Sequence, residues 1–515
     1  MGSQITRRSL LRGGGAHLAG AAAVGAAGPA LLRTATADAA TTRAEQRKNV
    51  VVIVADRMRA DFVGVYADDY DNTTPAKTPN LDAFAKESLR FKHSVPESMP
   101  AVPMRNGLLT GVRSFPFRDW KATPGMPAIP GWNGVYDYLP LMPELLQQHD
   151  VNTLYVTNNP LLTGPRSAPW ARPTRRLPTS ADHTATQRSY FQPLRRMAAR
   201  VDPTPEVMAR GVRALDRLKG RQPFFLALDA FDPDEVFQQP IAYVTGPVAD
   251  RIDHTSGVPA DHYDYGQLVS VDVDDATREE VRSRYADEVA AADRAIGDVL
   301  NKLHDLRLDE STLVFVLGDC GIALGEQGVF GYPTGVYHRR VYEVPHMIRD
   351  PHGRRSGDES GFFASSHDVA PTVLSWFGVT IPGRMAGEDL NVMLDDDDFR
   401  EPSRPYFTTG LDLQVVVGDT RYLLHGEIVR SHRRLYETNT SDDPEDITFR
   451  TETKPTVLES LWRHALNAAG GTLPDFSSTA AIRPKRERDD NQVPQDGTLT
   501  DSDEVDAQKL SQTGG

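Results

Sequence analysis

Residues 49–56 read Asn-Val-Val-Val-Ile-Val-Ala-Asp, a continuous apolar run that ends in a carboxylate. A run this rich in β-branched residues predicts a strand that is buried on both faces, as in a parallel sheet. Similar short runs recur at residues 153–157, 223–229 and 312–317. The chain is therefore expected to contain several buried strands.

Helical patterns lie between these runs. Apolar residues recur three or four positions apart from Val281 to Leu303, and residues 368–374 resemble the start of a further helix. Strands that alternate with helices predict an α/β fold with a mainly parallel central sheet flanked by helices. Such sheets bind ligands at the carboxyl ends of their strands. Asp56 and Asp319 both follow predicted strands and are expected at that edge.

Composition limits the class of protein. The 515 residues are enough for one large domain or two ordinary ones around a sizeable core. The formal net charge of −14 gives no general attraction to nucleic acid or anionic lipid, so no nucleic-acid partner is expected. Cys320 is the only cysteine in the sequence and cannot form an intramolecular disulfide, so stability has to come from the core.

The first 39 residues are predicted to be a signal peptide. They carry Arg7, Arg8 and Arg12, then an apolar Ala/Gly-rich stretch over 16–32, then small residues before position 39. The order resembles the twin-arginine consensus, which implies export of a folded protein to the extracellular space or cell envelope. The alternative is an amphipathic or transmembrane N-terminus, but the apolar stretch is too short and Gly-rich to anchor a span. No stable membrane span is expected after removal of the signal.

The rest of the chain divides by composition. Residues 40–47 are predicted to be a linker, and residues 48–400 an α/β domain. Short β-like stretches over 401–475 predict a small C-terminal α+β subdomain. Residues 476–515 are rich in Pro, Asp, Gln, Thr and Ser with few apolar residues, which predicts a disordered tail.

An ordered set of motifs resembles the sulfatase family of the alkaline phosphatase superfamily. The resemblance implies an alkaline-phosphatase-like sheet, hydrolysis of sulfuric or phosphoric esters, a divalent cation and a nucleophile in a C-x-P-x-R motif. The motifs occupy residues 49–56, 78–82, 103–111, 285–297, 313–321, 324–328, 344–349, 366–372 and 435–437.

The implied metal site is depleted. The resemblance implies that two adjacent aspartates after the first strand, and an Asp-His or Asp-Asn pair after a later one, hold the cation. Here the pairs read Asp56-Arg57 and Asp319-Cys320. A guanidinium about 4 Å from a divalent ion repels it by about 8 kcal/mol at an effective dielectric of about 20. Arg57 is interpreted as a built-in, anion-binding cation that pairs with Asp56 and Asp319; the alternative is that both aspartates are residual metal ligands. No cofactor is expected, or a calcium- or magnesium-type cation if the site is active.

The implied nucleophile is also missing. Alignment on Pro103 and Arg105 places Ala101 at the nucleophile position, and alanine has no nucleophilic group. Of the functional residues in this loop only Arg105 remains, and it is expected either to bind an anion or to pair with Asp56 or Asp319. Ser98 is a weak substitute, because its use would require the loop to be re-threaded.

Other pocket positions depart from the family pattern too. Cys320 is interpreted as a small apolar filler, with a soft metal ligand as the alternative. His93, His338 and His367 are interpreted as surface or helix-capping side chains in preference to ligands. The remaining pocket candidates are Leu161, Asp234, Cys320, Gln327 and His338.

These observations favour one function over two others. The favoured hypothesis is an exported sulfatase-like protein that has lost metal-dependent catalysis and binds a small anionic, sulfated or phosphorylated ligand or a glycan. The second is an active ester hydrolase in which Asp56, Asp319, Asp234 and His338 hold a metal and water attacks directly. The third is a structural partner of an active sulfatase. The oligomeric state is left open.

Overall fold

The computed structural model describes parts of the chain between residues 49 and 468. The predicted signal (1–39), linker (40–47) and tail (476–515) lie outside the described residues, so their boundaries stay predictions. The described residues are 49–70, 72, 74–99, 101–113, 140–157, 191–193, 203–230, 269–270, 275–326, 329–331, 339–395, 405–409, 414–427, 433–437 and 454–468.

An eight-stranded sheet forms the centre, and β1 (Asn49–Ala55) lies inside it. It pairs in parallel with β7 (Thr312–Gly318) on one side and with β5 (Phe224–Asp229) on the other. Next to β5 follow β3 (Asn152–Thr157) and β4 (Phe191–Pro193), also in parallel. All four apolar runs singled out in the sequence are strands of this sheet, which confirms that prediction.

The sheet contains one antiparallel strand. Strand β10 (His346–Arg349) runs antiparallel to β7 and to β2 (Leu89–Phe91). The edge strand β11 (Glu359–Ser360) is parallel to β2. The predicted mainly parallel sheet is therefore confirmed.

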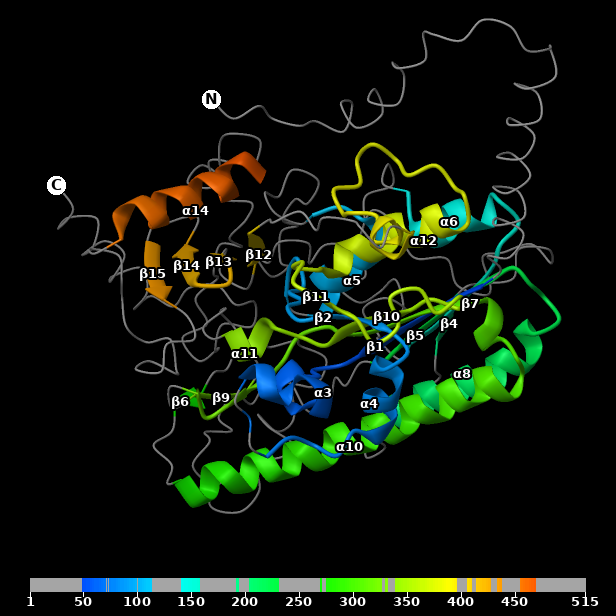
Figure 1. The fold of residues 1–515 in the computed structure, drawn as a ribbon, viewed down its shortest axis with the longest axis horizontal. Helices are drawn as coiled ribbons and strands as arrows, with labels where there is room; N and C mark the ends of the chain where they lie inside the picture. The colour runs from blue at the N-terminus through cyan, green and yellow to red at the C-terminus, as the bar shows by residue number, and fades with distance from the viewer. Residues whose placement is uncertain are drawn as a thin grey trace, which may run out of the picture. The chain divides into compact units, whose positions relative to one another are not determined.

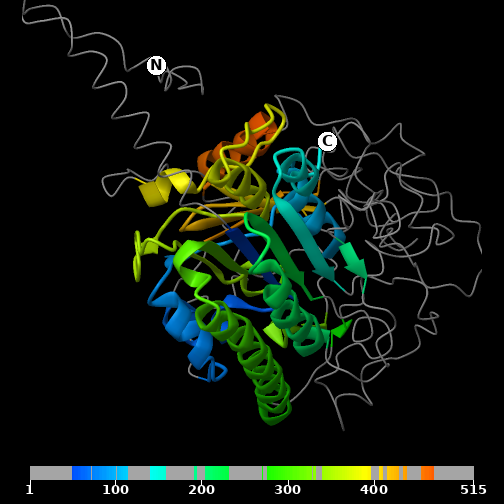
Figure 2. The same cartoon turned by 90° about the vertical axis from the view of Figure 1, so that its right-hand side faces the viewer.

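Helices cover both faces of the sheet (Figure 1, Figure 2). On one face lie α4 (Pro79–Ala85), α8 (Pro203–Leu218) and α10 (Asp275–Asp305). On the other lie α5 (Ala101–Thr110), α6 (Met142–Gln147) and α12 (Val369–Trp376).

Alternation along β1 explains the two layers. Val51, Ile53 and Ala55 belong to the core cluster that includes residues of α4, α8 and α10. Val50, Val52 and Val54 belong to the cluster on the α5, α6 and α12 side. Because successive side chains of a strand point to opposite faces, one apolar run supplies both cores.

A second sheet forms the small C-terminal subdomain. It consists of the antiparallel strands β12 (Tyr406–Thr409), β13 (Gln414–Gly418), β14 (Tyr422–Glu427) and β15 (Arg433–Glu437). Helix α14 (Pro455–Ala468) packs against β13, β14 and β15 around its own apolar cluster. The predicted small subdomain with β-like stretches is confirmed.

Short elements complete the described part of the chain. No described helix combines the length and the apolar character that a membrane crossing requires. The short elements are η1 (Ala60–Phe62), α3 (Gly64–Ala67), η2 (Asp68–Tyr70), β6 (Val269–Ser270), η4 (Asp309–Ser311), β8 (Ala323–Leu324), β9 (Val329–Gly331), α11 (Arg339–Tyr342), η6 (Ser366–Asp368) and α13 (Asn391–Asp395).

Candidate active site

Strand register brings three aspartates to one edge of the sheet. Ala55 of β1 pairs with Gly318 of β7, so Asp56 and Asp319 follow at the same level. Asp229 is the last residue of β5 and pairs with Val54. Asp56 and Asp319 were expected at this edge from the sequence and Asp229 was not, although Asp229 also stands at the carboxyl end of a buried apolar run.

Arg105 lies among these aspartates and is fully buried. Its Nε donates to both carboxylate oxygens of Asp229 at 2.7 and 2.9 Å, and its Nη1 donates to Asp319 Oδ2 at 2.8 Å. Nη2 donates to the carbonyl oxygen of Ala230 at 2.8 Å and lies 3.8 Å from Asp56 Oδ1. Burial opposes the charge of Arg105, but the aspartates hold its pKa well above the usual range. Arg105 is therefore a cation fixed by the protein's own carboxylates.

Strand β3 supplies further donors to Asp229. The hydroxyl of Tyr155 donates to Asp229 Oδ2 at 2.8 Å, and the hydroxyl of Thr157 lies 3.2 Å from the same oxygen. Burial, and next the charge of Asp229, raise the pKa of Tyr155, so its hydroxyl stays neutral. Asp229 thus accepts hydrogen bonds from Arg105, Tyr155 and Thr157 at once.

Arg57 has a left-handed backbone conformation with φ of 50°. Such a conformation costs a residue with a side chain about 1–2 kcal/mol. Three hydrogen bonds offset that cost. The backbone N–H of Arg57 donates to Asp319 Oδ1 at 2.7 Å, its Nε donates to Asp56 Oδ2 at 3.1 Å, and Tyr285 Oη donates to its carbonyl oxygen at 2.6 Å. The turn after β1 is therefore built around this arginine.

Arg59 locks the same turn to the segment after β7. Its guanidinium donates to both oxygens of Asp61 at 2.8 and 2.7 Å and to Glu326 Oε1 at 2.9 Å. It also donates to the carbonyl oxygen of Ile322 at 2.9 Å. These bonds are buried, so the two turns that carry Asp56 and Asp319 are fixed relative to each other.

Asp56 and Asp319 share a hydrogen bond. Burial, and next the charge of Asp319, raise the pKa of Asp56 well above its usual value. Burial also opposes ionisation of Asp319, but Arg105 and the hydrogen bond from Asp56 hold the pKa of Asp319 below its usual value. The surroundings thus favour the protonated form of Asp56 and the ionised form of Asp319.

The residues do not fit the divalent cation that the resemblance implies. Asp319 Oδ1 accepts the backbone N–H groups of Arg57 and Cys320, each at 2.7 Å. Its remaining bonds are with Arg105 and Asp56. A carboxylate offers about four lone-pair positions, and these four bonds occupy them. Among the described residues, no three His, Cys, Asp or Glu side chains are grouped to hold a metal ion.

Buried charges at this edge of the sheet face groups of opposite sign. Among the described residues, Arg57 lies against Asp56 and Asp319, and Arg105 lies against Asp229 and Asp319. Such buried charges are stable only when they are paired.

The other sequence candidates fall in different places. Ala101 is the first residue of α5, and Arg105 lies one helical turn further along. Cys320 is buried beside Asp319, and Ser98 is buried just before α5. Outside the described residues lie Leu161, Asp234, Gln327 and His338.

Two of the histidines can be placed. His93 is 19% exposed, and its Nδ1 lies 3.5 Å from Glu343 Oε1. His367 is buried in η6, although the sequence analysis interpreted it as a surface or helix-capping side chain. The difference arises because η6 packs against α5.

Residues 48–379 match the sulfatase family. The chain belongs to the sulfatase family. An ulvan-active sulfatase from Formosa agariphila is 26% identical over 373 residues, which cover 68% of this chain and 66% of that protein. The multifunctional alkaline phosphatase superfamily protein PehA from Trinickia caryophylli is 25% identical over 398 residues, covering 67% of this chain and 76% of that protein.

Solved structures show the same fold. One neighbour was solved in complex with its substrate, D-glucosamine-2-N,6-O-disulfate. It has a TM-score of 0.59 and 16% identity, and the match covers 84% of this chain and 99% of that one. This neighbour agrees with the α/β fold that the sequence predicted.

Proposed function

We propose that this sulfatase-family chain is an exported protein that has lost metal-dependent ester hydrolysis and binds an anionic sugar in its inherited site. One observation carries the proposal. The backbone and guanidinium of Arg57 occupy the carboxylates that would otherwise hold a cation, with bonds to Asp319 and Asp56 at 2.7 and 3.1 Å.

Two physical effects support the loss of hydrolysis. A divalent ion about 4 Å from the Arg57 charge would be repelled by about 8 kcal/mol at an effective dielectric of about 20. Ester hydrolysis also requires an activated nucleophile, and Ala101 supplies none at the start of α5. The two effects are independent, so reversing either one alone leaves the other in place.

Arg57 is also the residue best suited to meet an anion. Its side chain keeps 5% exposure, whereas that of Arg105 has none. Burial, and next the charge of Asp319, raise the pKa of its hydrogen-bond partner Asp56, so Asp56 offers Arg57 less negative charge than an exposed aspartate would. The disulfated sugar bound by the structural neighbour suggests the ligand class, a sulfated monosaccharide.

The first experiment tests hydrolysis. The purified chain and Asp56→Ala are assayed on aryl sulfate, phosphate monoester, phosphodiester and phosphonate esters, each with Ca²⁺, Mg²⁺, Mn²⁺ or Zn²⁺. We expect no turnover above that of Asp56→Ala. Turnover that requires a metal and disappears in Asp56→Ala would contradict the loss of catalysis.

The second experiment tests binding. Calorimetric titration with D-glucosamine-2-N,6-O-disulfate and with unsulfated D-glucosamine is expected to give heat for the sulfated sugar only. Arg57→Gln should weaken that binding about tenfold, because a charge-assisted hydrogen bond contributes about 1.5–3 kcal/mol. Arg421→Gln, which removes an exposed arginine of the C-terminal sheet, is the matched control. Equal affinity in the chain and in Arg57→Gln would exclude Arg57 as the anion-binding group.

An active hydrolase remains the second candidate. It is favoured by the convergence of Asp56, Asp229 and Asp319 at one edge of the sheet. In that case added divalent metal should raise the unfolding temperature of the chain, and Asp319→Asn should abolish the increase. No shift with any of the four metals would exclude a bound-metal mechanism.

Export is the part of the proposal that rests on sequence. If residues 1–39 are a twin-arginine signal, the double substitution Arg7→Lys and Arg8→Lys should leave the chain inside the cell. Cell fractionation followed by immunoblotting measures this. Release that is unchanged in the double variant would exclude the twin-arginine route.

A further inference from the structure

Helix α8 has one apolar side and one basic side (Figure 1). Its apolar side belongs to the core cluster that also contains residues of α10. Arg210, Arg213 and Arg217 recur three or four residues apart and therefore lie along another side of the helix. The turn after the helix adds Lys219 and Arg221. These five residues, all exposed except the half-buried Arg210, are called the basic row.

Few carboxylates offset the basic row. Between residues 203 and 222 the acidic residues are Glu206 and Asp216. Glu206 Oε1 lies 2.8 Å from Arg210 Nε and 3.7 Å from Arg213 Nη2, so one carboxylate serves two cations. Asp216 pairs with Lys302 of α10 at 2.7 Å and is therefore not a partner of the row.

The other cations of the row have no carboxylate partner among the described residues. Arg217, Lys219 and Arg221 are exposed, and the described ion pairs of α8 involve other side chains. The chain as a whole has a formal net charge of −14, so this surface differs in sign from the average of the protein. Salt screens such a charge over about 10 Å, so the row attracts anions locally.

The basic row is separate from the site around Arg57. Arg221 comes just before β5, whereas Asp229, which bonds to Arg105 in that site, is the last residue of β5. The six residues of this strand span about 20 Å, so the two regions lie at opposite edges of the sheet. From Arg210 to Arg217 the helix rises by about 10 Å. The row therefore has the dimensions to follow an extended chain.

We propose that the basic row of α8 binds a sulfated polysaccharide chain. Guanidinium groups form charge-assisted, bidentate hydrogen bonds with tetrahedral oxyanions such as phosphate, and sulfate esters have the same arrangement of oxygens. The repeating charges of such a polymer would meet successive cations of the row.

Other polyanionic partners fit the row less well. Residues 213–222 include no aromatic side chain on which a nucleic-acid base could stack. The apolar side of α8 lies in the core, so it cannot enter a membrane. Duplex DNA, with one charge about every 1.7 Å, would also bring more of the acidic protein surface into repulsion than a single narrow chain.

The experiment is a calorimetric titration of the full chain with dextran sulfate, and with unsulfated dextran as the neutral polymer. We expect only the sulfated polymer to bind, with an affinity that falls as salt is raised. The triple substitution Arg213→Gln, Arg217→Gln and Arg221→Gln should weaken binding about tenfold. It should also make the plot of log K against log salt concentration shallower by about 2. The corresponding three Lys substitutions keep the charge and should retain most of the affinity.

A matched control removes the same amount of charge elsewhere. Lys77→Gln, Lys86→Gln and Arg463→Gln together neutralise three exposed cations outside α8. Because charges on other parts of the surface are screened from the row, this variant should keep the affinity within about twofold. Unfolding temperatures of all variants are measured alongside, so that a loss of folding is not mistaken for a loss of binding.

Several results would overturn the proposal. Absence of dextran sulfate binding, or equal binding of unsulfated dextran, would exclude a site for a sulfated chain. An affinity unchanged by the three Gln substitutions would place the polymer on other basic residues, such as those over 483–488. An equal loss in the matched control would reduce the effect to net charge. Duplex DNA bound as tightly as dextran sulfate would assign the row to nucleic acid instead.

Discussion

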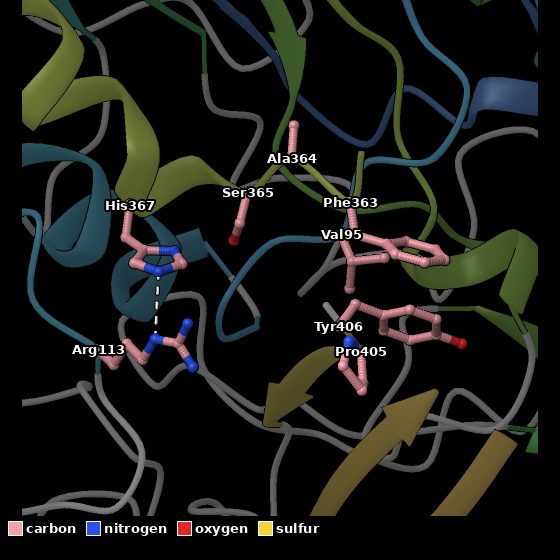
Figure 3. A pocket seen from close by; sticks show the side chains of 8 residues that line it. All are labelled: Val95, Arg113, Phe363, Ala364, Ser365, His367, Pro405 and Tyr406. Carbon is pink, nitrogen blue, oxygen red and sulfur yellow. Dashed lines mark hydrogen bonds between the residues drawn. The ribbon is translucent and has the colours of Figure 1, made fainter. Parts of the chain in front are cut away.

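Two arginines, one inside helix α5 and one just after it, have different surroundings. Arg105, inside the helix, is fully buried and bonds to Asp229, Asp319 and a backbone carbonyl. Arg113, three residues past the helix, is half-buried, lines a pocket and donates from Nε to His367 Nε2 at 3.2 Å (Figure 3). The first arginine is held by buried carboxylates and stabilises structure. The second has a histidine as its described partner, so the comparison separates an arginine fixed by charge pairing from one that contacts a titratable ring.

The largest expected effect on stability comes from removing a carboxylate partner of Arg105. Asp229→Asn should lower the free energy of unfolding by about 3–5 kcal/mol, because it leaves the buried Arg105 with an incomplete set of partners. Denaturant unfolding followed by circular dichroism measures this. Glu206→Gln, at the half-exposed pair with Arg210, is the control and should cost at most about 0.5 kcal/mol. Equal effects of the two substitutions would contradict a structural role for the Arg105 network.

A smaller effect on stability is expected when Arg57 is replaced by a residue that can bind a metal ion. Arg57→Asp adds a third carboxylate beside Asp56 and Asp319 and removes the repelling charge. The variant, unlike the parent chain, should be stabilised by Ca²⁺, by about 2.7 kcal/mol at a concentration 100 times the Kd. Thermal unfolding with and without Ca²⁺ measures it. Arg57→Gln removes the cation without adding a ligand, and a similar Ca²⁺ response there would show that charge removal alone suffices.

The pH dependence of stability extends the comparison to a buried histidine, His346. His346 lies near the rings of Phe91 and Phe315, and burial lowers its pKa from 6.5 to about 3. Between these values the unfolded chain binds a proton that the folded chain does not. His346 therefore makes stability fall as the pH drops below about 6.5, by up to about 1.4 kcal/mol per pH unit, until about pH 3.

The measurement is the unfolding free energy at pH 7 and pH 5 for the chain and for His346→Gln. The fall between the two pH values should be smaller in the variant by roughly 2 kcal/mol. Other groups titrate in both proteins, so only this difference is interpreted. Identical falls would show that His346 does not contribute to acid sensitivity.

The smallest effect on stability is expected at Ser365, which lines the same pocket as Arg113. Ser365→Ala removes a buried hydroxyl that has no partner among the described residues, so stability should change by less than about 0.5 kcal/mol or increase. Thr372→Val is the contrast. Its hydroxyl donates to the carbonyl oxygen of Asp368 at 2.6 Å and accepts from the N–H of Leu390 at 2.9 Å. We expect this substitution to cost about 1–3 kcal/mol, and thermal unfolding compares the two.

Much of the fold could be predicted from sequence because it follows from local chemistry. The Val/Ile run over 49–55 specifies a doubly buried strand, and the spacing from Val281 to Leu303 specifies an amphipathic helix. Both are properties of neighbouring residues. The departures at Arg57, Ala101 and Cys320 are predictions of the same kind, because each rests on the position of a residue within a motif.

Asp229 could not be recognised from the sequence as part of the site. It ends the predicted run over 223–229, just as Asp56 and Asp319 follow theirs, yet no motif drew attention to it. Its role depends on β5 lying next to β1, and strand order is set by packing of the whole sheet. Tyr285 is similar: its spacing marks it as a core residue, but only the folded chain brings its hydroxyl to Arg57.

The sequence by itself determined the strands and the helices, because these depend on residue type and order, and it predicted the missing nucleophile and metal ligands on the same basis. The tertiary structure decided how the remaining groups are used. It brought Asp229 and Asp319 to Arg105, gave Arg57 its left-handed turn, and left the Ser365 hydroxyl in a pocket. Hydrogen bonds depend on direction and on distances of a few tenths of an ångström, and only the packed chain sets these.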